Sequence, residues 1–170
     1  MSEIIRWGIL GTGNIAHSFA KGLAALPDAQ LHAVGSRAQE TADAFGAQFS
    51  VPNCYPSYDA LVADPGIDVI YVATPPSTHC EYTLAAAEAG KPCLVEKPMA
   101  CNANECEQMV DAFKAKNLPL FVAFYRRALP RFLKMRDLLR DERIGTLTSV
   151  HITQYARLAT GEKAKTWRYD

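Results

Sequence analysis

The sequence lacks a long apolar run and lacks an excess of charge of either sign. No apolar run approaches the roughly 20 residues needed to cross a bilayer, and residues 1–6 do not form a secretory signal. Eighteen basic residues balance 18 acidic ones, so the chain has no general attraction for nucleic acid or anionic membranes. We therefore expect a cytoplasmic protein that binds neither nucleic acid nor membrane.

The sequence also lacks a cysteine pattern typical of metal binding. The five cysteines include no C-x-x-C pair, and their odd number does not suit a closed disulfide framework. This pattern favours reduced thiols, and we expect no metal site. The chain has 170 residues, 49% of them hydrophobic, which suits one full α/β domain and the beginning of another.

Short apolar segments alternate with helical segments over the first 124 residues. We expect strands over residues 4–10, 31–35, 68–73, 92–95 and 120–123, with a brief strand around Cys54. Helices are expected over residues 14–26, 39–45, 59–63, 78–89 and 102–116, with Gly46 as a helix C-cap. Alternation of this kind implies right-handed crossovers and a parallel sheet covered on both faces. The predicted fold is a doubly wound α/β (Rossmann) domain.

The pattern changes after about residue 125. A helix is expected over residues 130–140, followed by a strand from Leu147 to Tyr155 that alternates apolar and polar residues. Such a strand belongs to a sheet with one solvated face and needs partner strands that the chain does not supply. We therefore predict a first domain over residues 1–124. Residues 125–170 are predicted to be the incomplete start of a second α+β domain with a largely antiparallel sheet.

A glycine motif lies between the first predicted strand and helix. In Gly11-Thr12-Gly13-Asn14-Ile15-Ala16, Gly11 permits a tight turn, Gly13 lets the backbone approach a pyrophosphate, and Ala16 permits close packing of helix on strand. The N-terminus of the helix then offers N–H groups to phosphate. At this position in a doubly wound chain the motif predicts dinucleotide binding.

The end of the second predicted strand bears on the choice of dinucleotide. NAD enzymes commonly place Asp or Glu there to bind the ribose 2′-hydroxyl, whereas this strand ends in Ser36-Arg37. A guanidinium suits the 2′-phosphate of NADP, although a solvated loop arginine is the simpler interpretation. The sequence favours NADP(H), and NAD(H) stays open.

The tripeptide Glu96-Lys97-Pro98 follows the strand at residues 92–95 and supplies the catalytic candidate. Ligands of doubly wound sheets bind beyond the carboxyl ends of the strands, so Lys97 is placed toward the nicotinamide. An ammonium there can hydrogen-bond a substrate hydroxyl or carbonyl and stabilise the alkoxide that forms around hydride transfer. A surface ion pair is the alternative for an isolated Glu-Lys pair.

The ordered set of motifs resembles the Gfo/Idh/MocA oxidoreductase family. Besides the motifs above, the matching segments are residues 73–79 (Ala-Thr-Pro-Pro-x-x-His), 89–92, 144–145 and 167–168. The resemblance implies a two-domain NAD(P)-dependent enzyme of about twice this length that acts on sugars, inositols, dihydrodiols or related small molecules. It also implies a homo-oligomer, associated through the sheet of the second domain.

The resemblance further implies roles for individual residues. Lys97 matches the catalytic lysine and Glu96 its neighbour in the cofactor site, and the Lys97–Pro98 bond is expected to be cis. The residues that match positions near the cofactor are Thr74, Pro75, His79, Trp167 and Arg168. Phe124 stands where many relatives have Asn, and the family's Asp and His partners of the lysine would follow Asp170. We therefore expect negligible turnover from residues 1–170 alone.

Two other functions fit the same sequence. Some non-catalytic regulators use this fold to sense NAD(P), and the intact Glu96-Lys97-Pro98 argues against that interpretation. Some relatives hydrolyse glycosides through transient oxidation by a retained NAD, and Ser36-Arg37 makes that less favoured.

Overall fold

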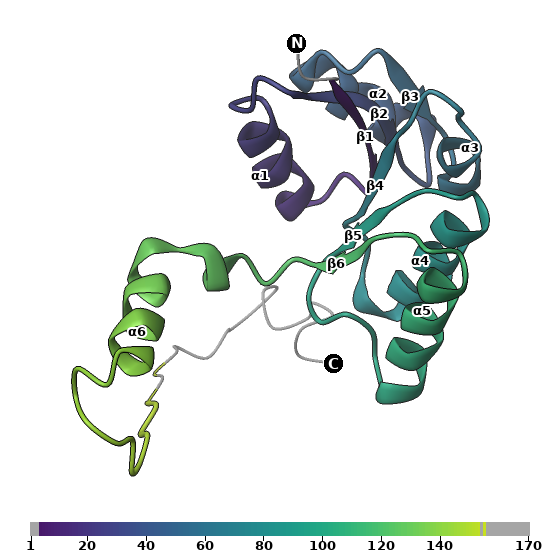
Figure 1. Ribbon diagram of the computed structural model, residues 1–170. Coiled ribbons are helices and arrows are strands. Elements are labelled where there is room, and N and C mark those ends of the chain that lie inside the picture. Colours follow the sequence, from purple (N-terminus) through teal and green to yellow (C-terminus); the bar gives the residue numbers. More distant parts are fainter. Residues whose placement is uncertain (1–3, 154, 156–170) are drawn as a thin grey trace. The chain divides into compact units, whose positions relative to one another are not determined.

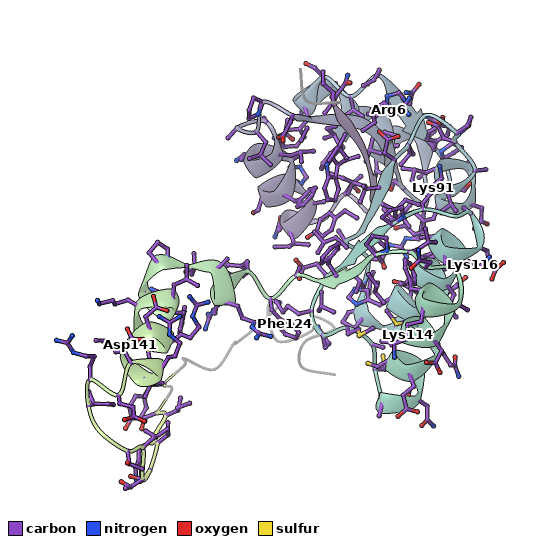
Figure 2. The ribbon with its side chains drawn as sticks, viewed as in Figure 1. Arg6, Lys91, Lys114, Lys116, Phe124 and Asp141 are labelled. Atoms are coloured by element: carbon purple, nitrogen blue, oxygen red, sulfur yellow. The ribbon has the colours of Figure 1, made fainter. Side chains whose placement is uncertain are left out.

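The computed structural model describes residues 4–153 and 155. The chain divides into two compact units, Met1–Ala123 and Phe124–Asp170, which are described separately. Figure 1 shows the first unit as a twisted sheet with helices on both faces, and Figure 2 shows side chains filling the space between these layers. The folding unit that carries the nucleotide motifs is thus a complete three-layer arrangement.

The sheet of the first unit has six strands, all parallel, in the order β3-β2-β1-β4-β5-β6. The strand order reverses between β1 and β4, which makes the carboxyl ends of these two strands the topological switch point. This arrangement confirms the predicted doubly wound parallel sheet. The strands are β1 (Ile5–Leu10), β2 (Ala29–Gly35), β3 (Asn53–Tyr55), β4 (Val69–Val72), β5 (Cys93–Val95) and β6 (Leu120–Val122).

Helices connect the strands and cover both faces of the sheet. They are α1 (Asn14–Leu23), α2 (Gln39–Phe49), α3 (Tyr58–Val62), α4 (His79–Glu88) and α5 (Ala103–Ala115), with a 3₁₀ turn, η1 (Pro76–Thr78), before α4. The start of α5 shows how sequence fixes such a boundary. The Asn102 side chain accepts from the Glu105 N–H (3.0 Å), and the Glu105 carboxylate accepts from the Cys101 N–H (3.0 Å), a variant of the capping box.

Successive side chains of a strand point to opposite faces of the sheet, so each strand contributes to the core on both faces. Ile9 and Tyr71 pack in the cluster on the α1–α2 side, whereas their neighbours Leu10 and Ile70 pack in the cluster on the α3–α5 side. All four are at most 1% exposed. Because both faces are buried, the strands read as continuous apolar runs, and this is why the sequence shows no alternation there.

The prediction that Gly46 ends the second helix is wrong. The helix α2 continues to Phe49 and ends at Ser50, which adopts a left-handed conformation with φ 56°. An added Cβ at Gly46 would collide with the Cys54 sulfur from β3. Gly46 therefore permits close packing of helix against strand, and a glycine required for packing imitates the sequence signal of a cap.

The second unit contains the 3₁₀ turn η2 (Tyr125–Ala128) and the helix α6 (Pro130–Arg140), the latter with the bounds predicted from the sequence. The predicted strand from Leu147 to Tyr155 is wrong for the residues that the structure describes, since residues 147–153 and 155 form no strand. Without a paired strand the apolar side chains of this pattern stay in solvent, as Ile152 and Tyr155 show by being 89% and 93% exposed.

Two absences concern the described residues alone. None of their helices is long and apolar enough to span a membrane. Among residues 4–153 and 155, no group of three or more His, Cys, Asp or Glu side chains is arranged to hold a metal ion.

Candidate functional site

The loops that leave β1, β2, β4 and β5 lie side by side at the carboxyl edge of the sheet. Backbone hydrogen bonds join them in sequence: Gly11 N–H donates to Gly35 O (2.9 Å), Ala73 N–H donates to Leu10 O (2.9 Å), and Glu96 N–H donates to Val72 O (3.0 Å). The glycine motif, Ser36, Thr74 and Glu96 therefore follow neighbouring strand ends. Motifs spread over 86 positions of sequence, from Gly11 to Glu96, meet at one edge because parallel strands end there together.

The two glycines of the motif are required for different reasons. Gly11 has φ +103°, and an added Cβ would lie 2.9 Å from the Ala73 carbonyl oxygen, so the protein's own backbone excludes a side chain there. Gly13 has φ −77°, which any residue adopts, and a Cβ built on it meets no described atom within 4 Å. The folded chain thus does not itself require glycine at position 13. Free space at this position fits the close approach of a pyrophosphate.

Helix α1 begins at this point and presents its N-terminus at the same edge. Gly13 is the N-cap and supplies no side-chain cap, and the first turn contains no acidic residue. The Asn14 and Ile15 side chains are exposed, Ile15 by 40%, and Thr12 is partly exposed. Uncapped N–H groups at the positive end of a helix, without a nearby carboxylate in that turn, suit an anionic group.

Ser36 and Arg37 follow β2 but differ in their surroundings. Ser36 is 6% exposed, and its hydroxyl lies 2.5 Å from that of Thr41, which in turn donates to the Ala38 carbonyl at 2.9 Å. Either hydroxyl can be the donor in this Ser36–Thr41 hydrogen bond, which holds the Ser36 side chain at the end of β2. Arg37 is exposed.

The charge of Arg37 acts on two tyrosines, Tyr58 and Tyr82, whose rings meet edge to face with centroids 4.7 Å apart. Burial raises the pKa of both phenols, and the nearby guanidinium lowers it in part. Arg37 therefore lies close enough to both rings for its charge to act on them. A cation at the end of β2 is in place for a phosphate on the adenosine side of a dinucleotide.

Glu96 and Lys97 follow β5 and differ sharply in exposure. The Glu96 side chain is 9% exposed and the Lys97 side chain 47%, with the ammonium 4.0 Å from the Glu96 carboxylate. The same carboxylate oxygen, Oε2, accepts the Lys97 backbone N–H at 3.0 Å. The Lys97–Pro98 peptide bond is cis, as the family resemblance implies. A buried carboxylate thus holds the backbone of an exposed lysine at the edge of the sheet.

His79 does not face outward, although the sequence places it near the cofactor. It is 1% exposed, and its two ring nitrogens lie 2.8 Å from the Pro98 and Thr74 carbonyl oxygens. A neutral ring has one N–H and donates to one of these oxygens, whereas a protonated ring donates to both. Thr74 is also buried, and its hydroxyl accepts from Thr78 at 2.9 Å. His79 therefore joins the loops after β4 and β5 from within, and Pro75 is the N-cap of η1, which connects Thr74 to His79.

Trp167 and Arg168, the remaining predicted cofactor residues, lie outside the described residues. One residue that the sequence reasoning missed is Tyr71, in β4. It is 1% exposed, and its hydroxyl donates to Glu96 Oε1 at 2.8 Å. A single hydroxyl inside the otherwise apolar run Val69-Ile70-Tyr71-Val72, one residue before a strand end, is the signal that could have identified it.

Comparison with known proteins identifies the family of this chain. Residues 5–124 match the model of the Gfo/Idh/MocA oxidoreductase family, described as having an NAD-binding Rossmann fold. The chain belongs to this family. The matched segment contains every residue of the candidate site that the structure describes, from the glycine motif to Lys97.

Curated relatives resemble the chain over most of its length. The mouse trans-1,2-dihydrobenzene-1,2-diol dehydrogenase is 37% identical over 84% of this chain and 44% of its own length. The NADP-dependent D-xylose 1-dehydrogenase of Hypocrea jecorina is 38% identical over 84% of the chain and 40% of its own length. The chain thus spans less than half the length of these two relatives.

A solved structure has a similar fold. The 3-ketoreductase KijD10 of Actinomadura kijaniata, in complex with TDP-benzene and NADP, superposes with a TM-score of 0.79 at 28% identity. The match covers 84% of this chain and 45% of KijD10.

Proposed function

We propose that the chain is the NADP(H)-binding part of an oxidoreductase that transfers a hydride to or from a CH–OH carbon of a sugar-like, polyol or cyclic diol substrate. The observation that carries the proposal is the free space at Gly13 beside the uncapped start of α1. No described atom lies near the position of a side chain at residue 13, so the described part of the fold does not itself require glycine there. A bound pyrophosphate does require glycine, because it approaches the backbone closely. In the family, two relatives are named for oxidation of a sugar and of a dihydrodiol.

In this proposal Gly11 forms the turn, with its own N–H bonded to Gly35 O, and Thr12 to Ile15 hold the pyrophosphate through backbone N–H groups. Arg37 holds the 2′-phosphate of the adenosine ribose. The Ser36 hydroxyl already shares a hydrogen bond with Thr41, and a neutral hydroxyl binds a phosphate less strongly than a guanidinium does. The preference for NADP therefore depends mainly on Arg37. Thr74 and Pro75 line the next loop, and Trp167 and Arg168 are proposed to complete the nicotinamide end.

When bound, the nicotinamide accepts or donates the hydride. Lys97 is the proposed catalytic residue, because its ammonium is exposed at the end of β5 while its backbone is fixed by Glu96. In oxidation, Lys97 as the neutral amine takes the proton of the substrate hydroxyl, and the resulting ammonium stabilises the alkoxide until its C–H hydride leaves. In reduction, the ammonium hydrogen-bonds the carbonyl oxygen, stabilises the alkoxide that hydride addition forms and returns the proton to it. We further propose that residues 125–170 begin a second domain that supplies the substrate site and the oligomer contacts.

The cofactor assignment is tested by titrating the chain with NADPH and with NADH and following nicotinamide fluorescence. NADPH is expected to bind at least about tenfold more tightly, a difference of roughly 1.4 kcal/mol, and Arg37→Ala is expected to abolish that preference. Arg136→Ala, an exposed arginine on α6, serves as the control and leaves the preference unchanged. Equal affinity for NADH in the unaltered chain contradicts the NADP assignment and favours an NAD enzyme or the NAD-retaining glycosidase chemistry.

A cofactor-sensing regulator is distinguished by the absence of hydride transfer. In the chain extended to the length of its relatives, NADP⁺ is offered with D-xylose, inositols or trans-1,2-dihydrobenzene-1,2-diol, and NADPH absorbance is followed. Reduction of NADP⁺ that Lys97→Met slows by at least about 100-fold supports the enzyme. Tight binding of NADP⁺ without reduction by any of these substrates favours the regulator.

A further inference from the structure

Two buried polar side chains, those of Tyr71 and His79, make hydrogen bonds to the loop that carries Lys97. On one side, the Tyr71 hydroxyl donates to Glu96 Oε1 (2.8 Å), while Glu96 Oε2 accepts the Lys97 N–H (3.0 Å). On the other side, a His79 nitrogen lies 2.8 Å from the Pro98 carbonyl oxygen. Glu96 and Pro98 are thus each fixed by a contact to β4 or α4, and Lys97 between them is held through its hydrogen bond to the Glu96 carboxylate.

Tyr71 is built to act as a fixed donor. Its ring stacks on Phe19 of α1, with centroids 4.0 Å apart and an interplanar angle of 23°, so it has little freedom to turn. Burial, together with the hydrogen bond and charge of Glu96, raises the pKa of the phenol well above its ordinary value of 10.0. The proton therefore stays on Tyr71, and the hydroxyl can only donate to the Glu96 carboxylate.

Glu96 needs this donor because it is buried. A carboxylate removed from water without hydrogen bonds is costly, and each of its two oxygens here has one donor, Tyr71 and the Lys97 backbone. Loss of the Tyr71 hydroxyl leaves Oε1 without that donor, and the carboxylate is then free to rotate or draw in water. Rotation releases the Lys97 N–H and shifts the ammonium that lies 4.0 Å away.

His79 fixes the other end of the same loop and ties it to the neighbouring one. Its second nitrogen lies 2.8 Å from the Thr74 carbonyl oxygen, so the loop after β4 and the loop after β5 share one buried ring. Thr74 and Lys97 belong to the proposed nicotinamide end, and their separation is set by this ring. A residue 1% exposed contacts no ligand directly and acts through the loops that it joins.

We propose that Tyr71 and His79 are positioning residues that hold the Lys97 loop in its working geometry. This inference rests on the proposed role of Lys97, but its first test does not require activity. In the chain as it stands, hydrogen exchange of the Lys97 amide is measured by NMR in Tyr71→Phe, which keeps the ring and the Phe19 stack and removes the hydroxyl alone. Tyr55→Phe is the matched control, because its hydroxyl also donates to a carboxylate, that of Asp64, at 2.9 Å.

The Lys97 amide is expected to exchange at least about tenfold faster in Tyr71→Phe and unchanged in Tyr55→Phe. The amides of Ile70 and Cys93, which bond to Pro92 and Pro119 in the sheet, keep their rates. An unchanged Lys97 amide overturns the proposal, as does an acceleration shared equally by Ile70 and Cys93, which indicates general loosening. His79→Leu is the second variant, with the same expectation and the same two contradicting outcomes.

Kinetics separate this inference from the proposed function. In the chain extended to the length of its relatives, Tyr71→Phe is expected to lower kcat by about tenfold while the Kd for NADPH changes by less than about threefold. In a Lys97→Met background Tyr71→Phe is expected to have no further effect on kcat, because both changes act on one group. If Lys97→Met leaves kcat unchanged, the catalytic role of Lys97 fails. If Lys97→Met lowers kcat and Tyr71→Phe does not, the positioning role alone fails.

Discussion

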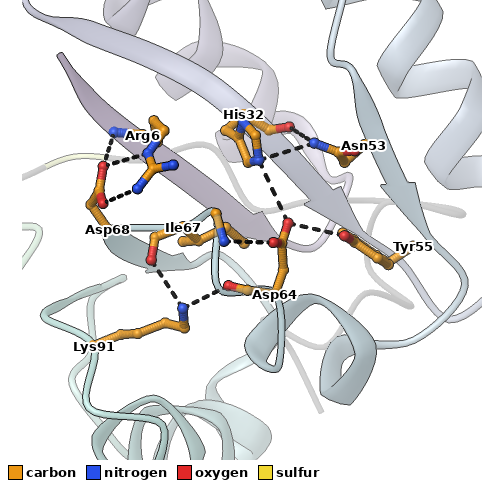
Figure 3. Close-up of polar contacts among 9 residues, drawn as sticks. Arg6, His32, Asn53, Tyr55, Asp64, Ile67, Asp68 and Lys91 are labelled. Atoms are coloured by element: carbon orange, nitrogen blue, oxygen red, sulfur yellow. Dashed lines mark hydrogen bonds and ion pairs between the residues drawn. The ribbon is translucent and has the colours of Figure 1, made fainter.

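Arg6 and Asp68 form a two-pronged ion pair across the first and fourth strands. Arg6 Nε donates to Asp68 Oδ2 at 3.0 Å and Arg6 Nη2 donates to Oδ1 at 2.7 Å, while the Arg6 backbone N–H donates to Oδ2 at 2.8 Å (Figure 3). The pair lies at the amino end of β1 and just before β4. It fixes the two strands that flank the switch point, at the edge opposite the candidate site.

The pair predicts a specific acid dependence of stability. The hydrogen bond from Arg6 is the main cause of the lowered pKa of Asp68, relative to 3.8 in the unfolded chain. A carboxyl whose folded pKa is lowered stabilises the fold above the unfolded value and loses this contribution as the pH falls through the folded value. Asp68→Asn should therefore lower the free energy of unfolding by about 0.5–1 kcal/mol at neutral pH, with solvent screening allowed for.

Urea denaturation of both proteins between pH values of about 2 and 7 checks this expectation. The difference between them should be constant at neutral pH and shrink once the pH falls below 3.8. A difference that persists undiminished at the lowest pH contradicts the charge-based explanation and points to lost packing.

Lys91 makes a second structural contact, away from the candidate site. Its side chain comes from the loop before β5, and the ammonium donates to the Asp64 and Ile67 carbonyl oxygens at 2.7 and 2.9 Å (Figure 3). Burial lowers the pKa of Lys91, and the charges of Asp64 and Asp68 oppose that shift. Lys91→Met should lower the free energy of unfolding by about 1.5–3 kcal/mol, because two carbonyls lose a charged donor.

Lys116→Met is the matched control for Lys91→Met. Lys116 pairs with Glu88 at 3.2 Å, and the Glu88 side chain is 76% exposed, so its loss should change stability by no more than about 0.5 kcal/mol. The two lysines are labelled in Figure 2. Equal effects of the two substitutions in chemical denaturation would show that the carbonyl contacts of Lys91 add nothing beyond an ordinary surface charge.

The sequence predicted the sheet because its signals there are local. Buried parallel strands appear as apolar runs, and residues such as Gly11, Gly35 and Pro92 mark where those runs begin or end. The position of the candidate site at this edge of the sheet was predicted from the rule that ligands bind beyond the carboxyl ends of such strands.

The errors and omissions arise from contacts between distant residues. Gly46 was interpreted as a cap because the Cys54 sulfur that packs against it belongs to another element. The strand predicted from Leu147 to Tyr155 requires a hydrogen-bonded partner strand, and the alternation of apolar and polar residues does not show whether one is present. Tyr71 was missed because its partner Glu96 is 25 residues away. The two carbonyl partners of His79, a residue predicted to lie near the cofactor, are likewise not visible in sequence.

The cysteines should react in an order set by their burial. Burial raises the pKa of Cys93 to about 12, and the residue is 0% exposed, whereas Cys101 is exposed. Because the thiolate is the reactive form, iodoacetamide at about pH 8 should modify Cys101 in the native chain and leave Cys93 unmodified. Peptide mass spectrometry with a denatured control, in which both react, measures this. Equal native rates at Cys93 and Cys101 would contradict the described packing of β5.

The account depends most on the claim that Gly13 is glycine for the sake of a dinucleotide, and Gly13→Ala tests it most directly. Since φ is −77° and an added Cβ meets no described atom within 4 Å, stability should stay within about 1 kcal/mol, because a poorer N-cap and a more restricted unfolded chain offset each other. Gly22→Ala, an equally unhindered position within α1, is the control. In a fluorescence titration with NADPH, Gly13→Ala should weaken binding by at least about tenfold and Gly22→Ala should leave it unchanged. An unchanged Kd in Gly13→Ala, with the fold intact, would contradict the account.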